Sequence, residues 1–274
     1  MSHNKPIYQF LRAEKKFPLI WCAGCGNGII MGAMLRAVYN LKLDKDKVSV
    51  VSGIGCSGRV STYIDFNTLH TTHGRALAFA TGLKFAKPEL TVIVAMGDGD
   101  ALAIGGNHFI HAARRNMDLT AVIFNNMIYG MTGGQISPTT PFGMTASTAP
   151  EGNIEQPFDI PRLAQAAGAT FVARGTTYNT EQLEMLLEQA IRKKGFSVVE
   201  VITQCPTIYG RYNRMGSAVE MLKWQEEHTI SIEEAQDSEE KAKGKILTGV
   251  FLDIERPEYI EQYEKLVERV QSKK

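Results

Sequence analysis

The chain has 274 residues, of which 44% are hydrophobic, and this is enough for a sizeable buried core. With 30 basic and 29 acidic residues the formal net charge is +1, so the chain lacks the basic excess of a protein that binds nucleic acid by electrostatics. No segment has about 18 consecutive apolar residues, and the opening MSHNKPIYQF has no apolar signal core, so we expect a cytoplasmic protein without a transmembrane helix.

Along the chain, apolar residues recur with two different patterns. We expect an irregular arm at 1–21 and a long loop rich in glycine, threonine and proline at 127–158, and a loop of that length is usually functional. Helical spacing predicts helices at 27–41, 74–86, 104–116, 160–167 and 180–194. Continuous apolar runs predict buried strands at 48–57, 90–100, 119–126, 170–173 and 196–203, some of which end in glycine turns. Because the strands are apolar on both faces and alternate with helices, we predict an α/β fold whose mostly parallel sheet has helices on both faces.

Residues 216–274 differ in character from residues 1–215. They contain an acidic run, SIEEAQDSEEKAKGK, then a short apolar stretch, ILTGVFL, and finally a charged helical segment, PEYIEQYEKLVERVQ. We interpret 1–215 as one domain and 216–274 as a C-terminal extension that packs on this domain or on a partner subunit. A solvated helix is the alternative interpretation of the last segment.

The chain has only four cysteines, in three segments that lie far apart in the sequence. Cysteines of cytoplasmic proteins are more often metal ligands or catalysts than disulfides. Four thiolates suit a zinc ion or a 4Fe–4S cluster, and the spacing alone does not decide between these two. A thioredoxin-like dithiol would use only the first pair and leave the other two without a role, although one of these can also be a small core residue. The four are Cys22 and Cys25 in a Cys-x-x-Cys pair, Cys56 in a glycine turn, and Cys205 before a proline.

Polar side chains follow two of the predicted strands. Asp98 lies in the turn GDGD after one apolar strand, and Asn126 ends the next strand. The carboxyl ends of parallel strands meet at one edge of a sheet, where ligands bind, so these two side chains are expected to converge. A carboxylate and an amide oxygen are ligands suited to Mg²⁺, which typically also takes phosphate oxygens. A plain turn is the alternative for GDGD alone.

The order of these features resembles the thiamine-diphosphate motif, in which an Asp and the second Asn hold the magnesium ion on the diphosphate. The continuation resembles, more narrowly, the β subunits of the multi-subunit 2-oxoacid:ferredoxin oxidoreductases, and within them most closely the 2-oxoglutarate enzymes. The resemblance covers about residues 15–215 and includes the closing RPEYIEQYEKL. The segments that carry it, in the order that the family shows, are CAGCG, GIGCSGR, THGRA, GDGDALAIGGNH, NNMIYGMTGGQ and TQCPT.

This resemblance implies a thiamine-diphosphate-binding fold and a decarboxylating oxidoreductase. The implied reaction is the oxidative decarboxylation of a 2-oxo acid, in which coenzyme A takes the acyl group and electrons leave through one 4Fe–4S cluster to ferredoxin. The same reaction runs backwards as a reductive carboxylation when a strong reductant is present. The cofactor carries the difficult chemistry, while the protein orients and tunes it.

The resemblance also implies roles for individual residues. Arg59 would face the substrate, where a guanidinium can clamp a carboxylate with two hydrogen bonds; the alternative is a surface arginine. His73 would contact thiamine diphosphate; the alternative is a histidine that caps a helix. The cluster ligands would be Cys22, Cys25, Cys56 and Cys205. The magnesium ligands would be Asp98, Asn126 and the carbonyl oxygen of Ile128. The residues lining the cofactor would be Ile54, Gly55, Cys56, Ser57, His73, Gly99, Asp100, Gly130 and Met131.

One part of a thiamine enzyme cannot be identified in this chain, namely the glutamate that hydrogen-bonds the aminopyrimidine ring. In the family this glutamate belongs to the α subunit. We therefore expect a heteromer, αβ or (αβ)₂, whose cofactor lies at a subunit interface and whose β chain is inactive alone. The further partners would be ferredoxin, coenzyme A and a 2-oxo acid, with no nucleic acid and no membrane.

Three alternatives stay open at this point. The substrate can be pyruvate or a branched-chain 2-oxo acid, because the partner subunit helps to shape the pocket. The chain can be a subunit of a non-oxidative thiamine decarboxylase or synthase, which needs no cysteine quartet. It can also be a non-enzymatic scaffold that zinc or a cluster stabilises, in which case Asp98→Ala would be harmless.

Overall fold

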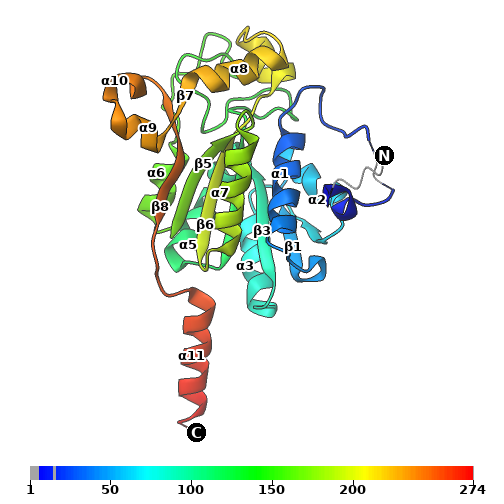
Figure 1. Cartoon of the computed structure of the whole chain (residues 1–274), viewed down its shortest axis with the longest axis vertical. Coiled ribbons are helices and arrows are strands. Elements are labelled where there is room, and N and C mark those ends of the chain that lie inside the picture. Colours follow the sequence, from blue (N-terminus) through cyan, green and yellow to red (C-terminus); the bar gives the residue numbers. More distant parts are fainter. Residues whose placement is uncertain (1–5, 15–16, 274) are drawn as a thin grey trace.

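The strands form one eight-stranded sheet that runs through the middle of the molecule (Figure 1). The computed structural model describes residues 6–14 and 17–273, so residues 1–5 and 15–16 of the expected arm, and residue 274 of the extension, lie outside the described residues. The strands are β1 (Val48–Ser52), β2 (Asn67–His70), β3 (Thr91–Gly97), β4 (Leu119–Asn125), β5 (Phe171–Thr176), β6 (Phe196–Ile202), β7 (Thr229–Ser231) and β8 (Ile246–Asp253). Their order is β2-β1-β3-β4-β6-β5-β8-β7, and every neighbouring pair is parallel except β5 and β8.

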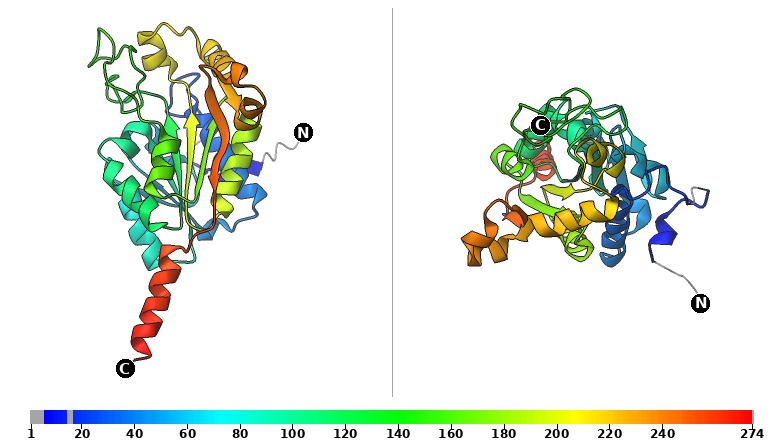
Figure 2. Two further views of the ribbon diagram at one scale, coloured as in Figure 1. Left: turned by 90° about the vertical axis from the view of Figure 1, so that its left-hand side faces the viewer. Right: turned by 90° about the horizontal axis from the view of Figure 1, so that it is seen from above.

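Helices cover both faces of this sheet (Figure 2). Strand β3 shows why, because Ile93 and Ala95 pack into the core on one face while Val92 and Val94 pack into the core on the other. A strand with two buried faces is apolar along most of its length, and the apolar run in this segment predicts such a strand. The predicted α/β architecture is confirmed. The covering helices are α1 (Asn27–Asn40) and α7 (Thr180–Arg192) on one face, and α3 (Ala76–Ala86), α5 (Gly106–Arg115) and α6 (Ile160–Ala167) on the other.

The shorter elements differ in part from the expectation. The arm is not wholly irregular, because Pro6–Phe10 is a 3₁₀ helix whose Phe10 side chain is buried in the core. Strand β2 was not predicted, since it is short and three of its four residues are exposed, so it gives no apolar run. The remaining helices are α2 (Val60–Tyr63), α4 (Asp98–Leu102), α8 (Ala218–His228), α9 (Ile232–Asp237), α10 (Glu239–Ala242) and α11 (Tyr259–Gln271), with further short turns at Lys45–Lys47, Ser57–Arg59 and Pro206–Gly210.

The strand order reverses between β1 and β3. The chain leaves β1 to form β2 on one side of it and then returns to form β3 on its other side. In open parallel sheets, ligands bind outside the carboxyl ends of the strands at such a reversal. The loop at 127–158 lies over this edge, in green at the top of Figure 1. The topology therefore places the binding edge where the glycine-rich turns and the long loop meet.

The C-terminal extension contributes two strands, β7 and β8, to the main sheet. Strand β8, which contains the apolar stretch ILTGVFL, pairs antiparallel with β5. Helix α11 projects away from the sheet (Figures 1 and 2), and the rings of Tyr259 and Tyr263 pack edge-to-face on Phe85 with centroid distances of 5.8 and 5.5 Å. No helix in the described part of the chain is long and apolar enough to cross a bilayer. The division into domains at residue 215 stays a prediction.

Candidate active site

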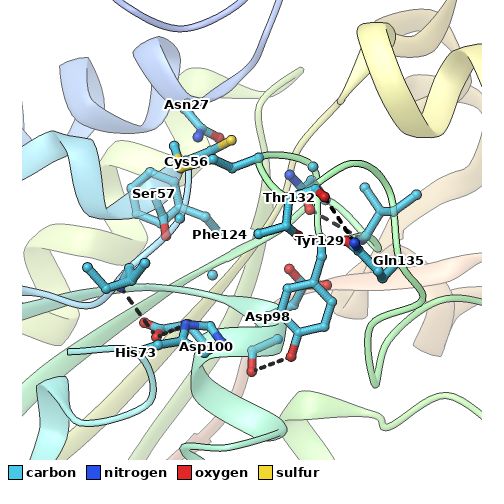
Figure 3. Close-up of a pocket in the computed structure, with 18 residues that line it drawn as sticks. Asn27, Cys56, Ser57, His73, Asp98, Asp100, Phe124, Tyr129, Thr132 and Gln135 are labelled. Atoms are coloured by element: carbon cyan, nitrogen blue, oxygen red, sulfur yellow. Dashed lines mark hydrogen bonds and ion pairs between the residues drawn. The ribbon is translucent and has the colours of Figure 1, made fainter. Parts of the chain in front are cut away.

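A cavity of about 340 Å³ opens at the carboxyl edge of the sheet, where the strand order reverses (Figure 3). Its wall comes mainly from the turns after β1, β3 and β4, and one residue from the start of α1 joins them. The lining residues are Asn27, Ile54, Gly55, Cys56, Ser57, His73, Gly97, Asp98, Gly99, Asp100, Phe124, Asn126, Ile128, Tyr129, Gly130, Met131, Thr132 and Gln135.

Asp98 is the buried carboxylate at one end of this cavity. Its Oδ2 accepts hydrogen bonds from the hydroxyl groups of Ser137 at 2.5 Å and Thr139 at 2.7 Å, both of which belong to the long loop. Burial raises the pKa of Asp98 to about 6, because the loss of hydration outweighs the hydrogen bonds that favour its charged form. A buried carboxylate of this kind is stabilised when a cation binds beside it.

Asn126 and Ile128 line the same cavity as Asp98. The backbone N–H of Ile128 donates to Asn126 Oδ1 at 3.3 Å, and Met127 between them has a left-handed φ of 63°. This tight turn keeps the Asn126 amide and the Ile128 backbone together. Carboxylate, amide and carbonyl oxygens are hard ligands that suit Mg²⁺ when other oxygens, such as those of a phosphate, complete the shell.

Asp100 is a second buried carboxylate, and it orients His73. The backbone N–H of Gly74 donates to Asp100 Oδ1 at 2.6 Å, and His73 Nδ1 lies 2.9 Å from the same oxygen. Burial raises the pKa of Asp100. Gly53 provides the space, since a Cβ at that position would lie 1.7 Å from Asp100 Oδ2. The carboxylate fixes the position of the His73 ring at the cavity wall, as Figure 3 shows.

Hydrogen bonds tie the three cysteine-bearing segments together. The indole N–H of Trp21, next to Cys22, donates to the carbonyl oxygen of Cys56 at 2.7 Å. The amide Nε2 of Gln204, next to Cys205, donates to the carbonyl oxygen of Gly24 at 3.1 Å. A Cβ built on Gly130 would lie 3.6 Å from Cys205 Sγ and 3.9 Å from Cys56 Sγ, so both thiols face the same glycine of the cavity wall. The fold thus gathers segments that are up to 180 positions apart in the sequence.

Burial raises the pKa of Cys25, Cys56 and Cys205, and the neighbouring thiolates raise it further. The pKa of Cys25 reaches about 12 and that of Cys56 about 11, while the pKa of Cys205 is also raised. Backbone N–H groups hydrogen-bond to the sulfurs and act in the opposite direction, for example that of Met131 on Cys56. Within 6–14 and 17–273, no three His, Cys, Asp or Glu side chains are arranged to hold a single metal ion. All four thiols are free, and none forms a disulfide.

Unpartnered polar groups in the cavity wall fit a polar occupant. The Ser57 hydroxyl, Asp100 Oδ2 and both amide atoms of Asn27 are buried and have no hydrogen-bond partner among the described residues. Each such group costs about 1–3 kcal/mol unless a ligand or water satisfies it. Gly55, with a left-handed φ of 120°, has no atom within 4 Å of the position of a Cβ, so a bound group can approach its backbone. The donors and acceptors therefore fit a large, polar cofactor.

The structure brings all of the predicted cofactor and magnesium residues into one wall, but not every predicted site residue. Arg59 is not among the lining residues, although its guanidinium lowers the pKa of Cys56 and therefore lies near it. Cys22, Cys25 and Cys205 are not among the lining residues, although the sulfur of Cys205 lies close to Gly130 of the wall. The sequence arguments missed several lining residues, although most of these stand in or beside segments that had been singled out: Asn27, Phe124, Tyr129, Thr132 and Gln135.

Comparison with known proteins decides the family. The model of the thiamine pyrophosphate enzymes, C-terminal TPP-binding domain, matches residues 51–201, which include the turns after β1, β3 and β4. The 2-oxoglutarate synthase subunit KorB of Methanocaldococcus jannaschii is 52% identical over 97% of this chain and 99% of its own length. This chain belongs to the β subunits of the 2-oxoacid:ferredoxin oxidoreductases. The family predicted from the sequence is confirmed, and so is its thiamine-diphosphate-binding fold.

Other members of the oxidoreductase family agree with this assignment. The KorB subunit of Archaeoglobus fulgidus is 53% identical over 94% of this chain and 92% of its own length. A solved structure, the 2-oxoglutarate:ferredoxin oxidoreductase from Magnetococcus marinus with 2-oxoglutarate, coenzyme A and succinyl-CoA bound, superimposes with a TM-score of 0.87 at 34% identity, over 98% of this chain and 92% of that chain. The chain is therefore an oxidoreductase subunit with the fold of this family over almost its whole length.

Proposed function

We propose that this chain is the β subunit of an enzyme that converts 2-oxoglutarate and coenzyme A into succinyl-CoA and CO₂ and reduces two molecules of ferredoxin by one electron each. The observation that carries the proposal is that Cys56 lines the same cavity as Asp98 and Asn126. An electron acceptor held by the cysteines would therefore be a direct neighbour of a cofactor held by Asp98. With a strong reductant the same site would run the reaction backwards, as a reductive carboxylation.

Thiamine diphosphate with Mg²⁺ would occupy the cavity, and it supplies the carbanion chemistry that cleaves the bond between the carboxylate and the 2-oxo carbon. Asp98, Asn126 and the carbonyl oxygen of Ile128 would hold the ion. The loop hydroxyls of Ser137 and Thr139 support Asp98 by holding its second carboxylate oxygen. The backbone near the diphosphate would be that of Gly99, Asp100, Gly130 and Met131, while Ile54, Gly55 and Ser57 would contact the rest of the cofactor.

The four cysteines would hold one 4Fe–4S cluster. Trp21 and Gln204 tie their three segments together, which supports a common ligand set rather than separate thiols. Coordination to iron removes the thiol protons, so the raised pKa values of Cys25 and Cys56 describe the chain without the cluster. The N–H groups that reach the sulfurs would remain in the loaded protein, where such hydrogen bonds tune the reduction potential of a cluster.

Two basic side chains would act on the substrate and cofactor. Arg59 stands near Cys56, outside the lining of the cavity, and its guanidinium would bind a carboxylate of the 2-oxo acid. His73, which Asp100 orients, would contact the thiamine cofactor. The choice of 2-oxoglutarate rests on the relatives, since those that match nearly the full chain are 2-oxoglutarate synthase subunits, and the Magnetococcus marinus enzyme binds 2-oxoglutarate.

An α subunit would complete the site. No glutamate is among the described residues that line the cavity, and thiamine enzymes need one to activate the cofactor. A relative from Aeropyrum pernix, 42% identical over 79% of this chain, is itself called subunit beta, which supports an assembly with a second kind of chain. The cavity would then lie at the interface of an αβ or (αβ)₂ heteromer.

The proposal is tested by assaying the co-purified αβ complex and the lone chain under anaerobic conditions. We expect the complex to reduce methyl viologen with coenzyme A and 2-oxoglutarate at a higher kcat/KM than with pyruvate or branched-chain 2-oxo acids. The lone chain should show no turnover with any of them. Turnover by the lone chain would contradict the shared site, and release of CO₂ without viologen reduction would indicate a non-oxidative decarboxylase.

A further inference from the structure

Asn27, the first residue of α1, has a buried side chain that the fold leaves without a partner. It is 1% exposed and lines the cavity, and neither its Oδ1 nor its Nδ2 makes a hydrogen bond within 6–14 and 17–273. Buried amides are almost always hydrogen-bonded, so each exception needs an explanation. Away from the cavity wall, the described residues have such orphaned side-chain atoms only at Ser197 and Thr203.

Asn27 links the cysteine segments to the cavity, because its backbone contacts one cysteine and its side chain lines the cavity. Its backbone N–H hydrogen-bonds to the sulfur of Cys25, while its carboxamide lies beside Cys56, at the opposite end of the cavity from Asp98 (Figure 3). The residue does not cap its own helix, because the N-cap position is Gly26 and no side chain caps α1. The carboxamide is therefore not used by the helix, by the core or by the thiols.

We infer that the Asn27 carboxamide is a further binding group of this cavity, which hydrogen-bonds the polar occupant at the Cys56 end. This inference rests on the proposed function, because the occupant would be the thiamine cofactor or the 2-oxo acid. A carboxamide offers two N–H donors and one acceptor oxygen, so it suits a carboxylate, a carbonyl oxygen or a ring nitrogen. Both candidate occupants carry such groups. The roles proposed for the other residues use no polar side chain from α1 at this end of the cavity.

The test compares Asn27→Leu and Asn27→Asp with the unchanged αβ complex. Leucine has a similar branched shape but no polar atoms, so it should leave unchanged or raise the Tm of the cofactor-free complex, because it removes two orphaned groups. It should at the same time weaken the binding of the occupant, either thiamine diphosphate or the 2-oxo acid, about 10- to 100-fold. Aspartate keeps the shape and loses both N–H donors, so it should weaken binding as much as leucine if the donors make the contact. Ser197→Ala is the matched control, since it removes a buried orphan far from the cavity and should leave binding unchanged.

Two measurements separate the possible occupants. Calorimetric titration of the cofactor-free complex with thiamine diphosphate and Mg²⁺ gives the cofactor Kd, and initial rates at saturating cofactor give the substrate KM. A raised Kd with unchanged KM supports a cofactor contact, and a raised KM with unchanged Kd supports a substrate contact. Unchanged values of both, or loss of iron from the variants, would overturn the inference, because Asn27 would then act only through water or through the Cys25 turn.

If the unchanged complex binds no thiamine diphosphate, the proposed function fails together with this inference. If the unchanged complex binds the cofactor and Asn27→Leu binds it equally well with the same KM, only the inference fails.

Discussion

The two ends of the cavity are built differently. At one end, Asp98 already has hydrogen-bond partners in Ser137 and Thr139, and it stands in a regular position at the end of a central strand. At the other end, the thiols come from three distant segments, and burial and mutual repulsion raise the pKa of Cys25 and Cys56. The first end is preformed for a cation. At the second end, the deprotonated thiolates become favourable only when a positively charged centre replaces the thiol protons.

This difference implies that the two cofactors are held by separable interactions. Only Cys56 belongs to both the cavity wall and the cysteine group, while Cys25 and Asp98 each belong to one. A change at Cys25 should therefore affect iron without affecting thiamine diphosphate, and a change at Asp98 should have the opposite effect. Five substitutions and titrations test this separation, and the largest effects are expected at the cluster and the magnesium site.

Cys25→Ser should remove the iron–sulfur cluster completely. Serine has nearly the same shape but provides no thiolate, so the ligand set would lose one of its four sulfurs. The anaerobically purified αβ complex should lose its iron, its sulfide and its absorbance near 400 nm, together with viologen reduction. Its affinity for thiamine diphosphate should stay within about twofold, because Cys25 does not line the cavity. Stoichiometric zinc in place of iron in the unchanged protein would contradict the cluster.

Asp98→Asn should give the reciprocal result. The amide has the shape of the carboxylate but not its charge, so we expect the affinity for thiamine diphosphate and Mg²⁺ to fall more than about 100-fold. Iron and sulfide contents should stay unchanged, as colorimetric assays would show. If Asp98→Asn loses iron as well, the two ends of the cavity are coupled rather than separable.

The raised pKa of Asp98 predicts a pH dependence of stability in the metal-free chain. The folded state holds the proton up to about pH 6, whereas the ordinary pKa of an aspartate is 3.8, so this group makes the free energy of unfolding fall as the pH rises from about 4 to 6. The full effect is about 3 kcal/mol and is complete above about pH 6. Urea titrations across this range should show a steeper fall in the unchanged protein than in Asp98→Asn, which keeps only the contribution of the other carboxylates, such as Asp100. Equal slopes in both would show that Asp98 titrates normally.

Binding of Mg²⁺ should compete with protonation of Asp98. A bound cation favours the charged carboxylate, so below about pH 6 the affinity for Mg²⁺ should fall by about tenfold per pH unit. Titration of the complex with the ion at several pH values measures this effect directly. An affinity that does not change between pH 5 and 6 would exclude Asp98 as the ligand that titrates.

Arg59→Lys should have the smallest effect, raising KM about tenfold when 2-oxoglutarate is the substrate, with less change in kcat. Lysine keeps the charge but cannot form the two parallel hydrogen bonds of a guanidinium with a carboxylate. Arg75→Lys is a matched control, because among the described residues the Arg75 side chain donates only to the carbonyl oxygens of Gly74 and Ile104 and does not line the cavity. An equal effect of both substitutions on KM would assign Arg59 a structural role.

The convergence of Asp98 and Asn126 could be predicted because it follows from a local rule. Each residue ends a continuous apolar run, and the carboxyl ends of parallel strands share one edge. Asn27 and Tyr129 could not be predicted in this way, since their place in the wall depends on how α1 and the long loop pack over that edge. The role of Arg59 stays a prediction, because its side chain lies outside the lining of the cavity and the motif does not say how a substrate would reach it.

Long-range pairing was equally beyond the reach of sequence arguments. The apolar stretch in β8 was noticed, but nothing in its composition indicates that its partner is β5, about 75 residues earlier, or that the pairing is antiparallel. Strand β2 gave no signal because it is short and three of its four side chains are exposed, so it forms no apolar run.

The pairing of β5 with β8 has a consequence for biosynthesis. During synthesis, β6 can cover one side of β5 soon after residue 202 has left the ribosome, but the other side stays open until residue 253 has followed. An open strand edge is a template for pairing with other chains. Nascent chains that stall between these two points therefore expose the unpaired side of β5, while the strands that form the binding site are already complete. The C-terminal extension then covers this side of the sheet last.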